Sequence, residues 1–163
     1  MNDKESVSFA RVVRPIIKQP VPGGMTTTEF NHCVDQHADG LYRFILKNIG
    51  DEDEARDVVQ DTFEKMWRNH DGIDAGKAKS YLFTTGYHTM IDKIRRKKHV
   101  ANFSEDNENA HYHEEHYSDL KELLNEAVNR LPEIQKAVLT LRDYEGYSYE
   151  EIGRITSLNP SQV

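Results

Sequence analysis

The stretch Lys77–His99, KAKSYLFTTGYHTMIDKIRRKKH, decides the fold because its apolar residues repeat with the period of an α-helix. Four of them stand at i, i+3, i+4 and i+7, the spacing of one helical face: Tyr87, Met90, Ile91 and Ile94. The other faces carry seven basic residues against one acidic residue, Asp92, a net charge of +6 in a chain whose net charge is -7. Such a cationic helix predicts a polyanionic partner or an acidic protein surface.

Three aromatic residues of the same stretch, Tyr81, Phe83 and Tyr87, lie among its basic residues. Aromatic rings between positive charges are typical of proteins that stack nucleic-acid bases while holding phosphates. The pattern therefore favours a phosphate-bearing partner. The alternative is an ordinary solvated helix end.

Two further helices are predicted before this stretch. Thr26 and Glu29 form a capping box that begins the first helix, and Gly50 ends it. Its apolar stripe is Phe30, Val34, Ala38, Leu41, Ile45 and Ile49. Asp51 and Glu54 begin the second helix, whose stripe is Ala55, Val58, Val59, Thr62, Phe63, Met66 and Trp67. The three helices can bury their stripes only against one another, which predicts a small bundle over residues 25–99.

Two segments lack such periodicity. Residues 1–24 are rich in Pro and Gly and are interpreted as a flexible leader, with Met25 as a candidate natural start. Residues 100–117 are polar and acidic. Between Ala101 and Glu126 there are eight acids and one base. This segment is predicted to be an acidic linker without a core of its own.

Residues 118–163 predict a second helical domain. One stripe runs over Leu120, Leu123, Leu124, Ala127, Val128 and Leu131, and another over Ile134, Val138 and Leu141. Pro132 suits the first position of the second of these helices. Ser148 and Glu151 form a capping box for a short helix, and Asn159 and Pro160 begin one more. The spacing is that of a helix-turn-helix, whose second helix is expected to be truncated at Val163.

Several function classes find no support in the sequence. No nucleophile, phosphate-loop or metalloprotease motif occurs, so we expect no enzyme activity, catalytic residue or cofactor. No apolar run approaches the roughly 20 residues that cross a bilayer, so we expect no membrane insertion. A single cysteine, Cys33, fits a reducing, cytoplasmic setting. His111, His113 and His116 are conceivable metal ligands, but a polar segment that contains histidine is the favoured interpretation, and no metal is expected.

The residues also resemble a family. The strings DEDEARDVVQDTFEKMW and AKSYLFTTGYHTMIDKIRRKK are similar to the second conserved region of bacterial RNA polymerase sigma factors of the extracytoplasmic-function group. LPEIQKAVLTLRDYEGYSYEEIGRITSLNPSQV is similar to the first part of their fourth region. The resemblance implies an all-α protein: a region-two bundle and a truncated helix-turn-helix region-four domain, joined by the acidic linker.

This resemblance implies a sigma factor that directs core polymerase to specific promoters and assists DNA opening. Polymerase contacts would come from Asp57, Gln60, Asp61 and Glu64, with Phe63 and Trp67 beneath them. DNA contacts would come from Lys77, Lys79, Ser80, Tyr81, Tyr87, His88, Asp92, Lys93, Arg95, Arg96, Lys97, Lys98, Pro160, Ser161 and Gln162. The implied partners are the largest and second-largest subunits of core RNA polymerase, promoter DNA and an anti-sigma factor.

Two rival hypotheses remain at this point. One is a stand-alone helix-turn-helix regulator that binds duplex DNA without polymerase. Such a protein has no use for a polymerase-docking face on the second helix. The other is a metal-linked interaction protein that uses the histidines of the acidic linker.

Overall fold

A computed structural model describes residues 24–101 and 119–163, and within these ranges every regular element is helical. The helices are α1 (Thr27–Ile49), α2 (Glu52–Arg68), α3 (Ala78–Ala101), α4 (Asp119–Asn129), α5 (Glu133–Asp143) and α6 (Tyr149–Thr156). Two single 3₁₀ turns, η2 (His70–Gly72) and η3 (Ala75–Lys77), connect α2 to α3. The predicted all-α fold class is confirmed. The leader, and the linker from residue 102 onward with its three histidines, lie outside the described residues.

The predicted starts of α1 and α2 are confirmed by their caps. The backbone N–H of Glu29 donates to the Thr26 hydroxyl at 3.3 Å, and the N–H of Thr26 donates to the Glu29 carboxylate at 2.8 Å. Gly50 ends α1 in the left-handed conformation, with φ of 79°. Asp51 accepts a hydrogen bond from the backbone of Glu54 at 2.8 Å and so begins α2. These side chains satisfy backbone groups that a helix end leaves unpaired.

The three N-terminal helices bury their stripes against one another, as predicted. Phe30, Leu41, Phe63, Leu82 and Met90 are at most 1% exposed. The crossing of α1 and α3 is especially close at Gly86, where an added Cβ would stand 2.7 Å from Leu41 Cδ1. A larger residue at this position would require the buried Leu41 side chain to shift.

Helix α3 continues through Val100 and Ala101, two residues beyond the predicted bundle boundary at His99. The last turn contains Lys98 and His99, and positive charge near a helix C-terminus stabilises the helix. The start of the acidic composition after Ala101 is therefore a better boundary between the bundle and the linker than Val100.

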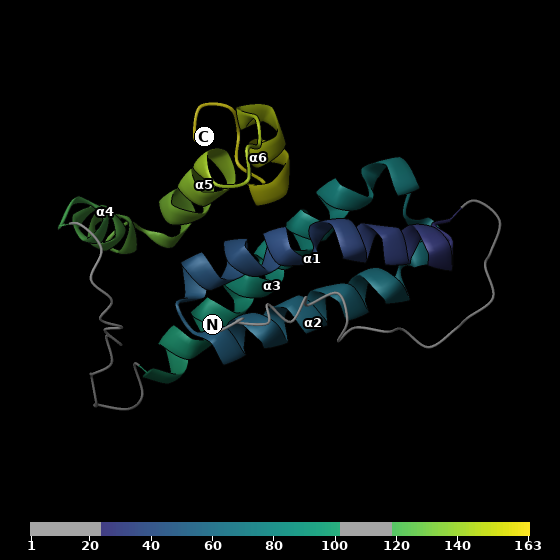
Figure 1. Cartoon of the computed structure of the whole chain (residues 1–163), viewed down its shortest axis with the longest axis horizontal. Coiled ribbons are helices and arrows are strands. Elements are labelled where there is room, and N and C mark those ends of the chain that lie inside the picture. The colour runs from purple at the N-terminus through teal and green to yellow at the C-terminus, as the bar shows by residue number, and fades with distance from the viewer. Residues whose placement is uncertain (1–23, 102–118) are drawn as a thin grey trace, which may run out of the picture.

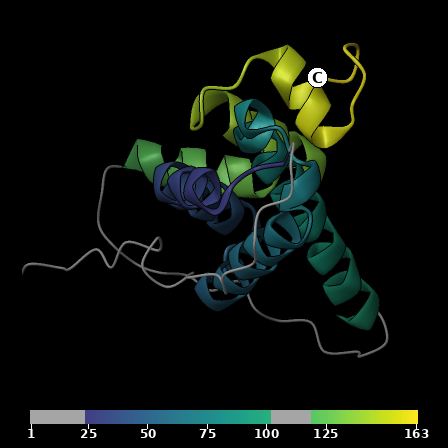
Figure 2. The ribbon, with the colours of Figure 1, turned by 90° about the vertical axis from the view of Figure 1, so that its right-hand side faces the viewer.

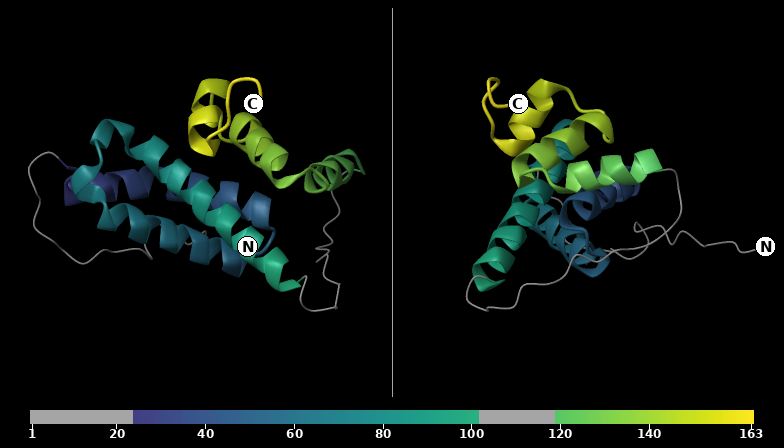
Figure 3. Two further views of the ribbon diagram at one scale, coloured as in Figure 1. Left: turned by 180° about the vertical axis from the view of Figure 1, so that it is seen from behind. Right: turned by 90° about the vertical axis from the view of Figure 1, so that its left-hand side faces the viewer.

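Helices α5 and α6 lie across α1 and α3, on the side of the bundle opposite α2 (Figure 1 and Figure 2). The view from behind shows α3 passing beneath both (Figure 3). Leu141, Tyr147, Ile152 and Ile155 are buried there and join the apolar cluster of the bundle. The N-terminal and C-terminal helices therefore share one continuous core.

Helix α4 differs from the others because its predicted stripe is largely uncovered. Leu123 is 62% exposed and Leu124 is 58% exposed. Pro132 precedes the first turn of α5 and is its N-cap, not its first helical residue as predicted. Its ψ of 146° is extended, and this directs α5 away from α4.

Candidate nucleic-acid interface

Helix α3 presents three faces, which its 3.6-residue period separates. One packs against α1 and α2, and a second lies beneath α6 and the loop before it. The third is open to solvent and is called here the exposed arc: His88, Asp92, Arg95 and Arg96. This arc contains four of the residues predicted to bind DNA, and two of the four are permanent cations.

The start of α3 adds further predicted contacts. Lys77, Lys79 and Ser80 are exposed, and Tyr81 is half-buried. The Asn69 amide donates to the Tyr81 hydroxyl at 3.3 Å, which ties the ring to the end of α2. Tyr81 is therefore held in place while part of its ring stays accessible.

The basic residues at the end of α3 divide into paired and unpaired groups. Lys93 forms an ion pair with Asp57 at 3.2 Å, and Lys97 forms one with Glu54 at 3.0 Å, both on α2. Lys98 pairs with Glu133 on α5. Arg95 and Arg96 form no ion pair with another described residue. All of the predicted cations from Arg95 to Lys98 point outward, as the sequence-based interpretation requires.

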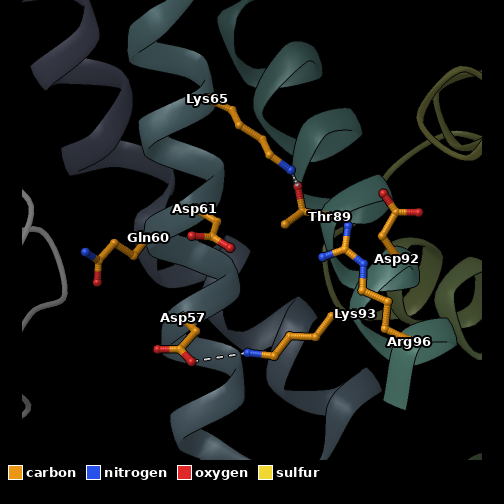
Figure 4. A pocket seen from close by; sticks show the side chains of 8 residues that line it. All are labelled: Asp57, Gln60, Asp61, Lys65, Thr89, Asp92, Lys93 and Arg96. Carbon is orange, nitrogen blue, oxygen red and sulfur yellow. Dashed lines mark hydrogen bonds and ion pairs between the residues drawn. The ribbon is translucent and has the colours of Figure 1, made fainter. Parts of the chain in front are cut away.

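A groove of about 490 Å³ runs between α2 and α3 (Figure 4). It brings predicted polymerase contacts and predicted DNA contacts into one hollow, lined by Asp57, Gln60, Asp61, Lys65, Thr89, Asp92, Lys93 and Arg96. Two of these were not predicted as site residues. The Lys65 ammonium donates to the Thr89 hydroxyl at 2.9 Å, and this hydroxyl donates to the carbonyl of Thr85 at 2.7 Å. Helical periodicity alone gives no sign of a contact between different helices.

The outward face of α2 carries the predicted polymerase contacts. Asp57, Gln60, Asp61 and Glu64 are all exposed and form the surface called here the α2 docking face. Phe63 is 1% exposed, so it supports this face from beneath without reaching the surface.

Trp67 is half-buried at the end of the same helix. Its ring stacks on His70 with centroids 4.4 Å apart and meets Phe30 edge-on at 5.0 Å. These contacts give the end of α2 a rigid aromatic base.

Part of the predicted DNA-binding set is covered by the C-terminal helices. Tyr87 is only 5% exposed. Burial raises the pKa of its hydroxyl, and the nearby Glu133 carboxylate raises it further while Arg95 opposes the shift. The Lys79 ammonium stands 4.6 Å from the ring centre of Tyr147. The sequence analysis did not identify Glu133 or Tyr147 as neighbours of α3.

The last predicted DNA contacts, Pro160, Ser161 and Gln162, are exposed in a turn after α6. The Asn159 side chain accepts from the backbone of Ser161 at 3.1 Å, and the Gln162 side chain accepts from the backbone of Asn159 at 3.1 Å. This reciprocal pattern is that of a capping box. It agrees with the expected start of a further helix at Asn159.

Neither a cluster of metal ligands nor a membrane-spanning helix occurs within residues 24–101 and 119–163. There, no group of three or more His, Cys, Asp or Glu side chains is placed to hold a metal ion. Burial raises the pKa of the Cys33 thiol to about 11, so the thiol stays protonated at neutral pH. Within the same ranges no helix combines the length and the hydropathy that a bilayer crossing requires.

Two family models match the chain. The model for Sigma-70 region 2 matches residues 33–100, and the model for Sigma-70, region 4 matches residues 121–163. The first match covers α2, α3 and most of α1, and the second covers α5, α6 and nearly all of α4.

Similar proteins carry names of the same kind. RNA polymerase sigma factor SigV of Bacillus subtilis is 29% identical over 136 residues, which are 80% of this chain and 80% of that protein. ECF RNA polymerase sigma factor SigM of the same organism is 28% identical over 73% of this chain and 76% of its own. The sigma factor RpoE, solved in complex with the anti-sigma factor NepR from Bartonella quintana, superimposes with a TM-score of 0.70 at 25% identity, covering 83% of this chain and 88% of that one.

Proposed function

Because this chain belongs to the extracytoplasmic-function group of bacterial RNA polymerase sigma factors, we propose that its N-terminal bundle holds polymerase on one surface and promoter DNA on another. As a sigma factor it directs core RNA polymerase to promoters, and members of this family are initiation factors without enzyme activity of their own. The stand-alone regulator is not favoured, since the relatives named above are all sigma factors.

The α2 docking face is the surface that we assign to the largest subunit of core polymerase. Asp57, Gln60, Asp61 and Glu64 are exposed along one helix, and a rigid apolar layer lies under them. A rigid, preorganised surface loses little conformational entropy when a partner docks, which favours binding. The excess of acid on this face suits a basic partner surface.

The exposed arc of α3 and the start of that helix are the surface that we assign to the minus-ten promoter element. Arg95 and Arg96 carry charges that no described acid neutralises, so they are free to hold phosphates. Tyr81 offers a ring against which an unstacked base could pack, at a cost of a few kcal/mol for unstacking that stacking offsets. In this way the bundle would assist strand opening.

The C-terminal helices are assigned to the minus-thirty-five element and to the second-largest subunit. Their helix-turn-helix spacing and the exposed turn at Pro160–Gln162 support this assignment. We further propose that an anti-sigma factor binds this chain, because the similar RpoE was solved with one. The cytoplasm, where polymerase works, is the proposed location.

The observation that carries the proposal is the presence of two exposed, oppositely charged surfaces on one rigid bundle. Two double variants separate them. Gln60→Ala with Asp61→Ala should weaken pull-down of the full chain by core polymerase. Arg95→Ala with Arg96→Ala should leave pull-down intact and weaken promoter binding by the holoenzyme. For this α3 variant, the slope of log affinity against log salt concentration should become shallower by about 1.4. Each lost contact with a single-strand phosphate accounts for about 0.7 of that change.

Arg56→Ala with Arg130→Ala is the matched control, because it removes two exposed arginines that lie on α2 and beyond α4 and pair with neighbouring acids of their own segments. Circular dichroism should show an unchanged fold in all three double variants. An unaltered salt slope for the α3 variant would reject the DNA assignment, and unaltered pull-down of the α2 variant would reject the docking face.

A further inference from the structure

His70 is a buried polar residue in the connection between α2 and α3, and the proposed function makes no use of it. The residue is 4% exposed and lies in the 3₁₀ turn η2, directly after the end of α2. Buried polar side chains hold hydrogen-bond partners where they occur. The partners of His70 therefore indicate what this side chain does.

The His70 ring closes the end of α2 through both of its nitrogen atoms. Nδ1 lies 2.5 Å from the carbonyl oxygen of Trp67, and Nε2 lies 3.0 Å from the Asp71 carboxylate. Both partners are acceptors, so both nitrogens donate when the ring carries both of its hydrogens. The Trp67 carbonyl belongs to the last turn of α2, where carbonyl groups lack partners within the helix. The face of the same ring stacks on the Trp67 indole, so two kinds of contact hold His70 against the helix end.

The backbone of His70 joins this connection to the start of α1. Its carbonyl accepts from the N–H of Met25 at 2.9 Å and from the N–H of Ile73 at 3.1 Å. Both of these residues are buried. Gly24 passes so close that an added Cβ would stand 2.2 Å from the carbonyl oxygen of Asp71. The connection is therefore fixed to α2, to the segment before α1 and within its own turn.

Asn69 carries this fixed geometry to the proposed DNA surface. It directly precedes His70, and its side-chain amide donates to the carbonyl of Lys65 at 3.0 Å and to the Tyr81 hydroxyl at 3.3 Å. The Asn69 side chain is short, so its reach depends on the backbone that His70 anchors. A change of backbone conformation at residues 69 and 70 would displace the amide from the Tyr81 hydroxyl.

We propose that His70 is a positioning residue for promoter DNA: it fixes the connection between α2 and α3, and through the Asn69 amide it holds the Tyr81 ring in place to receive an unstacked base. This role rests on the proposed function of Tyr81, and it adds a buried residue that makes no DNA contact itself. A ring that is ordered before binding loses less conformational entropy on binding, so the affinity for DNA rises.

His70→Leu tests this role, because an apolar side chain removes both hydrogen bonds while keeping the buried site filled. The probe is a fluorescein-labelled single-stranded oligonucleotide of mixed sequence. It is bound at low salt to the full chain assembled with core polymerase and followed by anisotropy. Affinity should fall roughly two- to tenfold, the effect of leaving one contact side chain to be ordered on binding. His70→Gln, which keeps a hydrogen-bond donor, should recover part of the loss.

A double-mutant cycle with Tyr81→Ala separates positioning from a general loss of stability. Tyr81→Ala removes the ring and should itself lower the affinity by at least roughly fivefold. Since His70 acts through this ring, His70→Leu should have no further effect in the Tyr81→Ala protein, because residues that act together are non-additive. Ile45→Val is the stability control, as it removes one buried methyl group about five turns from the start of α1. It should lower the free energy of unfolding and leave the affinity for DNA unchanged.

Tyr81→Phe is a second test that leaves the buried site intact, so it decides the matter even where His70→Leu does not fold. It keeps the ring but removes the hydroxyl that the Asn69 amide holds. The loss of affinity should be similar to that of His70→Leu and smaller than that of Tyr81→Ala. An unchanged affinity for Tyr81→Phe would show that the Asn69 contact does not order the ring, and would overturn the inference.

A loss with His70→Leu that disappears in the Tyr81→Ala background, at unchanged pull-down by core polymerase, supports the inference. Equal losses in the two backgrounds overturn it, as does an unaltered affinity for His70→Leu beside a loss with Tyr81→Ala. A parallel loss of polymerase pull-down also overturns it, because His70 would then support the α2 docking face through Trp67. Only an absence of any effect of Tyr81→Ala overturns the proposed function of Tyr81 as well, so the two failures are distinguishable.

Discussion

The N-terminal bundle and helix α4 have the same kind of amphipathic sequence but differ in how far their apolar residues are buried. Both carry apolar residues at helical spacing, and both form helices. The stripes of α1, α2 and α3 are buried against one another, whereas Leu123 and Leu124 of α4 stay exposed. An amphipathic pattern therefore specifies a helix and the face that prefers burial, but not whether a partner covers it.

The packing of helices α5 and α6 is intermediate between that of the bundle and that of α4. Leu141, Ile152 and Ile155 are fully buried, partly against α1 and α3, yet the loop between the two helices brings unsatisfied polar groups into the contact. Packing quality therefore decreases from the three-helix bundle, through the contact of α5 and α6 with α1 and α3, to α4. The following variants test that order at each level.

Replacing Phe63 by Ala should have the largest effect on stability. The ring is 1% exposed and meets Phe30 edge-on, with centroids 6.4 Å apart. Its loss should lower the free energy of unfolding by about 3–5 kcal/mol, measured by urea denaturation. Leu124→Ala on α4 is the control and should change it by less than about 0.5 kcal/mol. Similar costs for the two variants would mean that α4 is packed in solution.

Replacing Gly86 by Ala should have the next largest effect. The new methyl group would stand 2.7 Å from Leu41 Cδ1, so the buried Leu41 side chain would have to shift within a packed core. We expect a loss of about 1–3 kcal/mol in unfolding free energy by thermal or urea denaturation. Gly72→Ala, where no atom lies within 4 Å of the added Cβ, should be neutral or slightly stabilising. A neutral Gly86→Ala would show that the packing at this crossing adapts as readily as the contact of α5 and α6 with the bundle.

The smallest effect is expected for Glu145→Gln, in the loop between α5 and α6 that packs against the bundle. Burial raises the pKa of Glu145, and Arg43 and Lys79 oppose this shift. The pKa of Glu145 is higher in the folded than in the unfolded protein. Its contribution to stability is therefore largest at low pH and is lost as the pH rises through the raised pKa. At pH 7 the neutral variant should therefore be more stable by up to about 1 kcal/mol.

This advantage should shrink as the pH is lowered toward 4.5. The measurement is the difference in urea midpoint between the two proteins across that pH range. Glu150→Gln, on the exposed side of α6, is the matched control for the change of charge. A stabilisation by Glu145→Gln that grows as the pH falls would contradict a raised pKa for Glu145.

Much of the fold could be predicted from local patterns. The capping residues Thr26, Asp51 and Ser148 begin helices where predicted, because a cap acts on backbone groups within three residues of itself. The stripes of the first three helices were placed correctly for a similar reason, since each helix has only one apolar face to bury. The outward positions of Asp57 and Asp61 follow from the same periodicity.

The relations between distant residues could not be predicted in this way. Nothing local in the sequence pairs Lys93 with Asp57 or Lys65 with Thr89, because such contacts depend on the angle and offset at which two helices cross. The same holds for Tyr87, whose place on the apolar face of the helix was predicted but whose neighbour Glu133 on α5 was not. Exposure is a property of the assembled molecule.

By itself, the sequence determined the helical class, the ends of most helices, the concentration of positive charge on α3 and the family, because these depend on residue type and short-range spacing. Only the tertiary structure decided how that charge is divided. It left Arg95 and Arg96 open, paired Lys93 and Lys97 with α2, and paired Lys98 with Glu133 of α5. The physical reason is that ion pairing and burial are set by which surfaces meet, and the C-terminal helices meet α3 on the face where its aromatic residues lie.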